Sequence, residues 1–253
     1  MGQGSGRPPT KNASLPPPAR GTDSATPSER RINSLTPSER RIDSVAPSER
    51  RISLSAPRRS SFPAPSVEPK VKGVAFRTID LCFERLRGAD ARNRSREHMP
   101  IELADAFRYY TVLASSWYPI SWYRETFRAF RATTNEGPEL AREIGKLAAR
   151  HDMSGVHKQI FAKFVSPQAL LSMSQRVFNT YYDTGRFEIT ASEPFHVQAR
   201  CANCVGWDHS MWMELAGSCV SLLEIAGARN VELHVLSGGL DGNPHAAFEA
   251  RWE

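Results

Sequence analysis

The spacing of apolar residues between Ile79 and Tyr181 is typical of a series of α-helices. Apolar side chains recur there every three or four residues, which places them on one face of a helix. A short strand is predicted from Val71, before the first helix. Gly88 is predicted to end that first helix. The second helix is predicted to begin at Pro100 and the third at Ser121. The six predicted helices carry these apolar positions: Ile79, Phe83 and Leu86; Ile101, Ala104, Phe107 and Tyr110; Tyr123, Phe127 and Phe130; Leu140, Ile144 and Leu147; Val156, Ile160, Phe161 and Phe164; and Leu170, Leu171, Val177, Phe178 and Tyr181.

Beyond Gly185 the period of the apolar residues changes to two, which is typical of strands. The predicted elements are, in order, two antiparallel strands (187–189 and 195–199), a long apolar helix (about 206–228) and two further strands (231–235 and 247–252). The sequence therefore predicts the α+β class, with a helical layer followed by a β-β-α-β-β antiparallel sheet unit.

The N-terminal part of the chain differs in composition from the rest. Residues 1–72 carry 13 Lys and Arg against 6 Asp and Glu, 12 of the 18 prolines, and a single aromatic residue, Phe62. Three ten-residue repeats with a Pro-Ser-Glu-Arg-Arg core cover residues 26–55. Each repeat has too few apolar side chains to offset the entropy cost of ordering. We therefore expect a disordered basic tail over residues 1–70 and a single α+β domain over residues 71–253.

Several serines of the tail follow a pair of arginines by two to four residues, a spacing that resembles the sites of basophilic Ser/Thr protein kinases. The candidate phosphorylation sites are Ser34, Ser44, Ser53 and Ser61. Each phosphate would add roughly −1.5 to −2 charges, so four of them would reverse the sign of the tail's charge. The alternative is a duplicated linker that carries no specific code.

The predicted domain is close to neutral, with 20 Lys and Arg against 21 Asp and Glu in residues 73–253. A basic nucleic-acid-binding face is therefore not expected. No stretch approaches the ~20 apolar residues of a membrane span, and the N-terminal residues lack the apolar core of a secretory signal. With only four cysteines, we expect a cytoplasmic protein without a disulfide framework.

Several short motifs keep a fixed order across residues 70–253. They are Trp117-Tyr118-Pro119, Tyr181-Tyr182-Asp183-Thr184-Gly185, Gly206-Trp207, Ala226-Gly227-Ala228-Arg229-Asn230-Val231, and Gly242-Asn243-Pro244 followed by Phe248 and Trp252. In these motifs the chain resembles a family of uncharacterised proteins that occurs as paralogues in myxobacteria. That family is distantly similar to the four-vinyl-reductase-like, haem–nitric-oxide-binding and TRAPP-subunit group. The resemblance implies helices packed on a small antiparallel sheet, often with an enclosed pocket for a small molecule or an acyl chain.

The chain departs from that group at two places. Four-vinyl-reductase-like domains commonly carry a metal-binding cysteine in a Gly-Asp-x-x-Cys-x-Phe pattern, where this sequence has Ala247. Haem–nitric-oxide-binding domains need an axial histidine and a Tyr-x-Ser-x-Arg motif, and that motif does not occur in the sequence. The resemblance therefore does not imply haem, and no cofactor is predicted.

Cys201 and Cys204 form a CxxC pair between a predicted strand and a predicted helix. A helix N-terminus next to the pair would stabilise a thiolate, which favours a redox role. A zinc site would need two more ligands, and the nearest, His209 and Cys219, lie too far apart on one helix for one ion to reach both. The third interpretation is a pair of buried structural cysteines. No metal site is predicted.

No catalytic residue is predicted. Histidine and aspartate are neighbours at 151–152 and 208–209, where an acid could orient a general base. The sequence has neither a GxSxG nucleophile motif nor an HExxH motif, however. Glu214 and Glu224 show no catalytic pattern, and Glu224 is expected to be partly buried in its apolar helix.

Aromatic residues are dense between residues 109 and 130, and this density has two interpretations. The rings form the core of the helical layer, or some of them line an apolar ligand pocket. The candidate pocket residues are Tyr110, Trp117, Tyr123, Phe127, Trp207, Met211 and Trp212.

These observations favour a non-enzymatic sensor or adaptor. Its domain would bind a small apolar ligand or a protein partner, and a Ser/Thr protein kinase would act on its tail. The rival hypothesis is a thiol-redox or metal-binding protein that uses Cys201 and Cys204. A third is an interaction protein that forms a homodimer through its sheet or its long helix, as TRAPP-like folds do.

Overall fold

A computed structural model describes residues 67–154 and 166–253 of the chain. The chain divides into two units, residues 1–60 and 61–253, and every described residue belongs to the second unit. Residues 1–66 of the predicted tail, with the candidate serines, and the predicted helix at 156–164 lie outside the described residues. The backbone is bonded into the fold from Pro69 onwards, since Ile120 N donates to Pro69 O (2.9 Å) and Lys70 N donates to Asp183 Oδ1 (2.7 Å).

In the described residues most helices come before the main strands, and one helix lies between two pairs of strands. The helices are α1 (Gly73–Ser95), the 3-10 turn η1 (Arg96–His98), α2 (Ile101–Arg108), α3 (Ile120–Thr134), α4 (Glu139–Ser154), α6 (Pro167–Ser172), α7 (Ser174–Tyr181) and α8 (His209–Ile225). The strands are β1 (Lys70–Lys72), β2 (Trp117–Pro119), β3 (Arg186–Glu193), β4 (His196–Ala202), β5 (Glu232–Gly238) and β6 (Ala246–Arg251).

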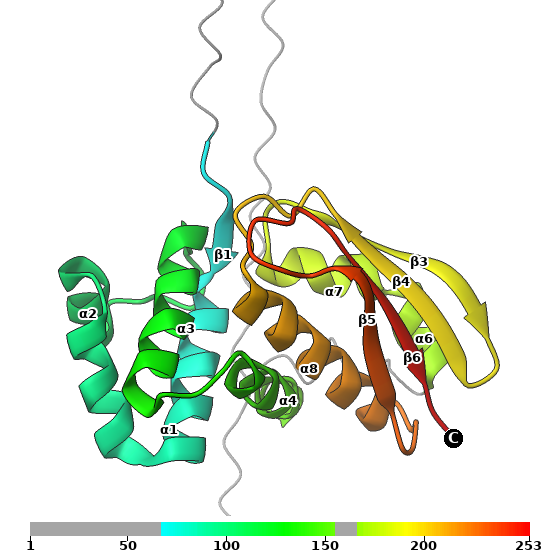
Figure 1. Cartoon of the computed structure of the whole chain (residues 1–253), viewed down its shortest axis with the longest axis horizontal. Coiled ribbons are helices and arrows are strands. Elements are labelled where there is room, and N and C mark those ends of the chain that lie inside the picture. The colour runs from blue at the N-terminus through cyan, green and yellow to red at the C-terminus, as the bar shows by residue number, and fades with distance from the viewer. Residues whose placement is uncertain (1–66, 155–165) are drawn as a thin grey trace, which may run out of the picture. The chain divides into compact units, whose positions relative to one another are not determined.

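The last four strands form one antiparallel sheet in the order β3-β4-β6-β5. The β3–β4 hairpin closes with Glu193 opposite His196, and α8 connects β4 to β5 (Figure 1). The predicted β-β-α-β-β unit and the α+β class are therefore confirmed. A separate pair of short strands, β1 and β2, joins the start of α1 to the start of α3.

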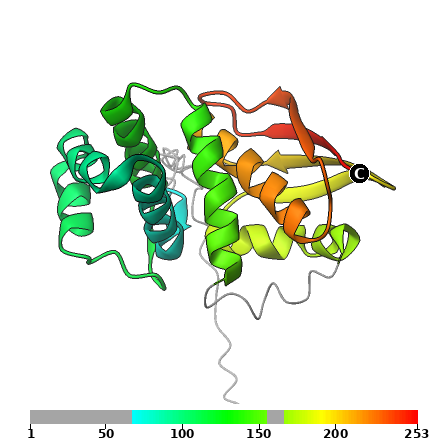
Figure 2. The same ribbon diagram turned by 90° about the horizontal axis from the view of Figure 1, so that it is seen from below.

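The two faces of the sheet have different surroundings. Helices α6, α7 and α8 lie on one face (Figures 1 and 2), and apolar side chains such as Val197, Phe248 and Ala250 are buried. The alternate positions carry polar side chains, and His196 Nε2 lies 2.9 Å from Glu249 Oε1. The period of two therefore separates an inner face from a solvated face, as expected for a sheet covered on one side.

Helices α4 and α8 cross at very short range because each has a glycine at the crossing. A Cβ on Gly145 would lie 2.1 Å from Glu214 O, and a Cβ on Gly217 would lie 2.1 Å from Arg142 O. Figure 2 shows α4 between the sheet with α8 on one side and the α1–α3 helices on the other. Because neither glycine has a side chain, α8 can lie directly against α4, the helix between the sheet and the α1–α3 helices.

Helix α8 is buried along almost all of its length, which explains why its sequence is apolar on every side. It begins at His209, later than the predicted start near Gly206, because the Asp208 side chain caps it by accepting from Met211 N (2.9 Å). Asp208 Oδ1 thus accepts from Met211 N, and Asp241 Oδ1 accepts from His209 N (2.8 Å). The helix starts five residues after Cys204.

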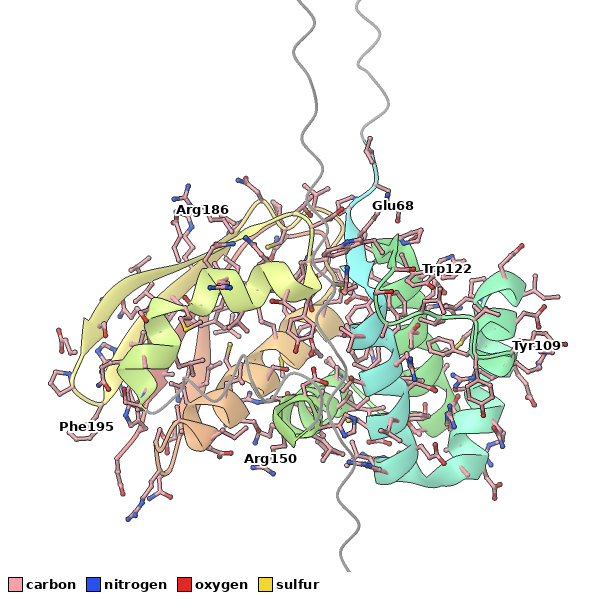
Figure 3. The ribbon with its side chains drawn as sticks, turned by 180° about the vertical axis from the view of Figure 1, so that it is seen from behind. Glu68, Tyr109, Trp122, Arg150, Arg186 and Phe195 are labelled. Atoms are coloured by element: carbon pink, nitrogen blue, oxygen red, sulfur yellow. The ribbon has the colours of Figure 1, made fainter. Side chains whose placement is uncertain are left out.

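Aromatic rings fill the space between α1 and α3. Phe83 and Phe130 stack with their centroids 4.0 Å apart, and Tyr123 contacts Phe76 (5.0 Å) and Phe127 (5.3 Å) edge to face. We call this group the aromatic layer. In Figure 3, Tyr109 beside α2 marks the outer end of this helical part, and Phe195 at the tip of the β3–β4 hairpin marks the opposite end of the domain.

The structure differs from the prediction after Gly88 and at the start of α3. Gly88 takes a left-handed φ of 87° and breaks the regular helix, as predicted, but the polar segment after it is again helical to Ser95. Arg92 of this segment and Arg96 directly after it both bond to the buried Asp80. Helix α3 begins at Ile120 after Pro119, one residue before the predicted cap at Ser121.

The helix predicted over Leu170–Tyr181 is likewise interrupted. Met173 separates α6 from α7, and its backbone lies outside helical geometry (φ −109°, ψ 1°). The two short helices can therefore follow the sheet, with Ser166 capping α6 through a bond from Ala169 N (3.2 Å).

Candidate functional site

A cavity of about 130 Å³ lies between the inner face of the sheet and the helices that cover it. The sheet and α6–α8 form most of its wall, while α1, α3 and α4 close one end. The lining residues, mostly aliphatic or aromatic, are Ala75, Thr78, Ile79, Tyr123, Ala148, Ala149, Asp152, Leu170, Leu171, Ser174, Val177, Phe178, Tyr181, Tyr182, Phe187, Ile189, Val197, Ala199, Glu214, Leu215, Ser218, Cys219, Leu222, Leu223, Leu233, Phe248 and Ala250. An engineered apolar cavity of roughly 150 Å³ is able to bind benzene, so a space of this size admits a small apolar group.

The polar groups of the cavity include a buried carboxylic acid, Glu214 of α8, which is 7% exposed. The Tyr182 hydroxyl donates to Glu214 Oε2 (3.2 Å), and the Ser218 hydroxyl lies 3.1 Å from Glu214 Oε1 and 3.1 Å from Gly145 O. The acid is therefore held by hydroxyl groups at the crossing of α4 and α8.

A second acid, Asp152 of α4, lines the same cavity and is also buried. The Thr78 hydroxyl donates to Asp152 Oδ1 (2.9 Å), and the Tyr181 hydroxyl donates to Asp152 Oδ2 (2.7 Å). Helices α1, α4 and α7 thus meet at this side chain, next to the acid of α8.

Burial shifts the titration of these groups. The pKa of Glu214 is raised from 4.5 to about 7, mainly by burial and to a smaller extent by the neighbouring Asp152, while the bonds from Ser218 and Tyr182 oppose the shift. Burial also raises the pKa values of Tyr123, Tyr181 and Tyr182 well above the ordinary value, with the two acids adding to the effect. The tyrosines are therefore hydrogen-bond donors at neutral pH, and Glu214 changes charge near pH 7.

The structure places the seven predicted pocket residues in three different settings. Tyr123 lines the cavity. Tyr110 is 78% exposed, and Trp117 lies at the surface with Lys72 Nζ 4.4 Å from its ring centroid. The remaining four, which are fully buried but absent from the cavity wall, are Phe127, Trp207, Met211 and Trp212.

Trp207 and Trp212 belong to a second set of packed rings beside the cavity. Phe178 lies 5.9 Å from Trp207, Trp207 lies 4.4 Å from Trp212, and Trp212 lies 6.3 Å from Phe248, all between ring centroids. Phe178 and Phe248 also line the cavity. The row of rings therefore supports one wall of the cavity from outside.

Cys201 and Cys204 are both fully buried free thiols and do not line the cavity. Burial raises the pKa of Cys201, whereas the hydrogen bond with Cys201 lowers that of Cys204. The pair does not adjoin a helix N-terminus, because α8 begins at His209 and is capped by Asp208. The structural feature that favoured a thiolate in the sequence is thus missing at this pair.

Neither a metal centre nor a membrane span emerges from the part of the chain that the structure describes. No group of three or more His, Cys, Asp or Glu side chains within residues 67–154 and 166–253 is arranged to hold a metal ion. Over the same residues, no helix is both long enough and apolar enough to cross a membrane.

Glu214 is the cavity residue that sequence reasoning missed. Of the two glutamates on the long apolar helix, Glu224 is partly buried, as expected, and forms an ion pair with Arg150 (2.8 Å). Glu214 is the deeply buried one. The available signal was its position between Met213 and Leu215, with Gly217 one turn further on the same helix.

The fold is similar to that of H-NOX domains. An H-NOX protein from K. algicida in the unliganded Fe(II) form has a TM-score of 0.55 and 10% identity, covering 72% of this chain and 96% of that one. A mutant of the T. tengcongensis H-NOX has a TM-score of 0.53 and 13% identity, covering 72% and 97%. An oxygen-binding H-NOX domain related to soluble guanylate cyclases has a TM-score of 0.52 and 12% identity, covering 72% and 95%.

At these identities the similarity shows a shared fold. It agrees with the predicted distant likeness to haem–nitric-oxide-binding domains. No protein-family model and no curated protein matches the chain.

The residues described around the cavity do not fit a haem. The described lining contains no histidine, lysine or arginine, so it offers neither an imidazole ligand for iron nor a cation for the haem propionates. Its charged positions are instead the acids Asp152 and Glu214. An axial histidine would have to come from outside the described residues.

Proposed function

We propose that residues 67–253 form a non-enzymatic sensor or adaptor domain that binds a small apolar ligand in the cavity. The observation that carries this proposal is the cavity itself, which is lined by apolar side chains from the sheet and from six helices, with a few hydroxyl and carboxyl groups at one end. Such a site is the usual form of a small-molecule pocket.

The H-NOX-like fold supports the same proposal. One structural neighbour is described as an oxygen-binding domain related to soluble guanylate cyclases. A fold that encloses a ligand between helices and a sheet is suited to a sensor, because ligand binding stabilises one arrangement of those elements.

The test is to fill the cavity in the full-length chain. Ala250 faces the cavity from β6, and Ala247 lies on the other face of the same strand. In Ala250→Leu the added carbons occupy the cavity, so binding of n-hexanol, measured by isothermal titration calorimetry, is expected to weaken by at least about tenfold. Ala247→Leu is the matched control and is expected to bind hexanol like the wild type. Equal binding by the two variants, or no binding by the wild type, contradicts the proposal.

We make four further proposals on the basis of the sequence. They are phosphorylation of the tail at Ser34, Ser44, Ser53 and Ser61, a protein partner or homodimer, a cytoplasmic location and membership of the myxobacterial paralogous family. The arginine pairs before the serines support the first of these. Incubation of the full-length chain with a basophilic kinase, followed by mass spectrometry of its peptides, tests it.

A further inference from the structure

The acid at the end of the cavity has hydrogen-bond donors but no basic partner. Glu214 accepts bonds from the hydroxyl groups of Tyr182 and Ser218, and no ion pair to it is formed by the described residues. A carboxylate has about four acceptor positions, so these two bonds leave capacity for a further donor.

The described cavity lining has acidic side chains but no basic ones. The described cavity wall carries the acid Glu214 and, among the described residues, no lysine, arginine or histidine that could pair with it. A buried carboxylate without a cation is costly, and a ligand that brings a cation to it offsets that cost. Conversely, a ligand with a carboxylate or phosphate would place like charges together away from water.

We infer that the cavity takes a small amphipathic amine, with its protonated amino group at Glu214 and its apolar body against the sheet. This inference rests on the proposed function and adds the chemical class of the ligand. The amino group would donate to Glu214 at the crossing of α4 and α8. The body would lie among side chains such as Leu215, Leu223 and Phe248, which line the apolar part of the cavity.

The size of the cavity limits the apolar body to about one ring or a short chain. Its volume of about 130 Å³ is close to that of a cavity that accommodates benzene. A six-carbon chain is therefore a suitable probe, and three probes with the same chain isolate the contribution of the head group: n-hexylamine, n-hexanol and n-hexanoate.

The experiment measures the affinity of the three probes for the full-length chain at about pH 8, by isothermal titration calorimetry. Hexylamine is expected to bind the wild type about tenfold more tightly than hexanol, because a hydrogen bond between charged groups is stronger than a neutral one. Hexanoate is expected to bind most weakly. In Glu214→Gln, which keeps the size of the side chain and removes its charge, the preference for the amine should fall to within about twofold.

Glu224→Gln is the matched control, since Glu224 lies on the same helix but pairs with Arg150 outside the cavity. It is expected to keep the wild-type preference for hexylamine. A wild type that binds hexanol as tightly as hexylamine overturns the inference and leaves the proposed function standing. A preference that persists in Glu214→Gln also overturns it. If none of the three probes binds, the proposed function fails together with the inference.

Discussion

The aromatic layer between α1 and α3 and the cavity beneath the sheet are both apolar, but one is filled and the other is hollow. In the aromatic layer, the rings of Phe83 and Phe130 stack at 4.0 Å and the ring of Phe127 lies edge to face with its neighbours. In the cavity wall, small residues such as Ala148, Ala199 and Ala250 occur among the larger lining side chains. The density of aromatic residues between residues 109 and 130 therefore marked mainly a packed core, whereas the cavity wall contains alanines as well as aromatic and branched residues.

The close contact between α4 and α8 explains why the cavity stays open. The α4–α8 crossing at Gly145 and Gly217 is a backbone-to-backbone contact, so the frame of the cavity does not depend on side chains filling it. Glu214 and Ser218, two of the polar residues of the cavity, lie at this crossing. Protein interiors are normally packed without voids, so an apolar space framed in this way favours a binding role.

The largest expected effect is on stability, and it differs between a substitution in the aromatic layer and one in the cavity wall. Phe127→Ala should reduce the free energy of unfolding by about 4 kcal/mol, because it opens a new void in a filled core. Leu223→Ala, in the cavity wall, should cost about 2 kcal/mol, because part of its surroundings is already empty. Chemical denaturation measures both, and the exposed Tyr110→Ala should change stability by less than about 0.5 kcal/mol. Equal losses for Phe127 and Leu223 would show that the two regions are packed alike.

The second effect concerns the frame of the cavity. Gly217→Ala should destabilise the domain by about 3 kcal/mol, because the new methyl group would overlap the Arg142 carbonyl and force α4 and α8 apart. Gly137→Ala is the control, since a Cβ there meets nothing within 4 Å. Thermal unfolding of both variants measures the difference. A stable Gly217→Ala protein would mean that the crossing is not close.

The third effect depends on pH. Burial raises the pKa of Glu214 from 4.5 to about 7, so the folded protein holds a proton that the unfolded chain has already lost between those values. Wild-type stability should therefore fall as the pH rises through this range, by up to about 3 kcal/mol. Glu214→Gln lacks this loss, so it should be more stable than the wild type at about pH 8 and similar to it at about pH 4.

Denaturant unfolding of the wild type and Glu214→Gln at several pH values measures this difference. Glu224→Gln, at the surface of the same helix, should follow the wild type. A stability difference between the wild type and Glu214→Gln that does not change with pH would show that Glu214 is not the titrating group.

The smallest effect concerns the thiols, which belong to neither region. Cys201 and Cys204 are fully buried, so both should react slowly with a thiol reagent at about pH 7 in the native chain and rapidly after denaturation. If one of them reacts rapidly in the native chain, and Cys204→Ser abolishes that reaction, the redox alternative gains. The hydrogen bond from Cys201 makes Cys204 the thiol to test, because it lowers the pKa of Cys204.

Much of the fold was predictable because local patterns decide it. The change of apolar period near Gly185 located the strands, and the uniformly apolar segment at 209–225 identified the central helix. The polar segment after Gly88 was misjudged because its arginines pair with Asp80 far along the helix, and only the folded chain brings those groups together. The break at Met173 has no sequence signal such as glycine or proline.

By itself, the sequence determined the order of most of the described helices and strands, the division into a proline-rich basic part and a near-neutral part, and the choice of an α+β class. These follow from composition and period, which act over a few residues. The cavity and the meeting of Glu214 with Asp152, Tyr181 and Tyr182 were decided only by the tertiary structure. The contact partners of a side chain depend on how its helix is turned and on how closely the neighbouring helix approaches. That approach is set by Gly145 and Gly217, whose role becomes visible only where the two backbones meet.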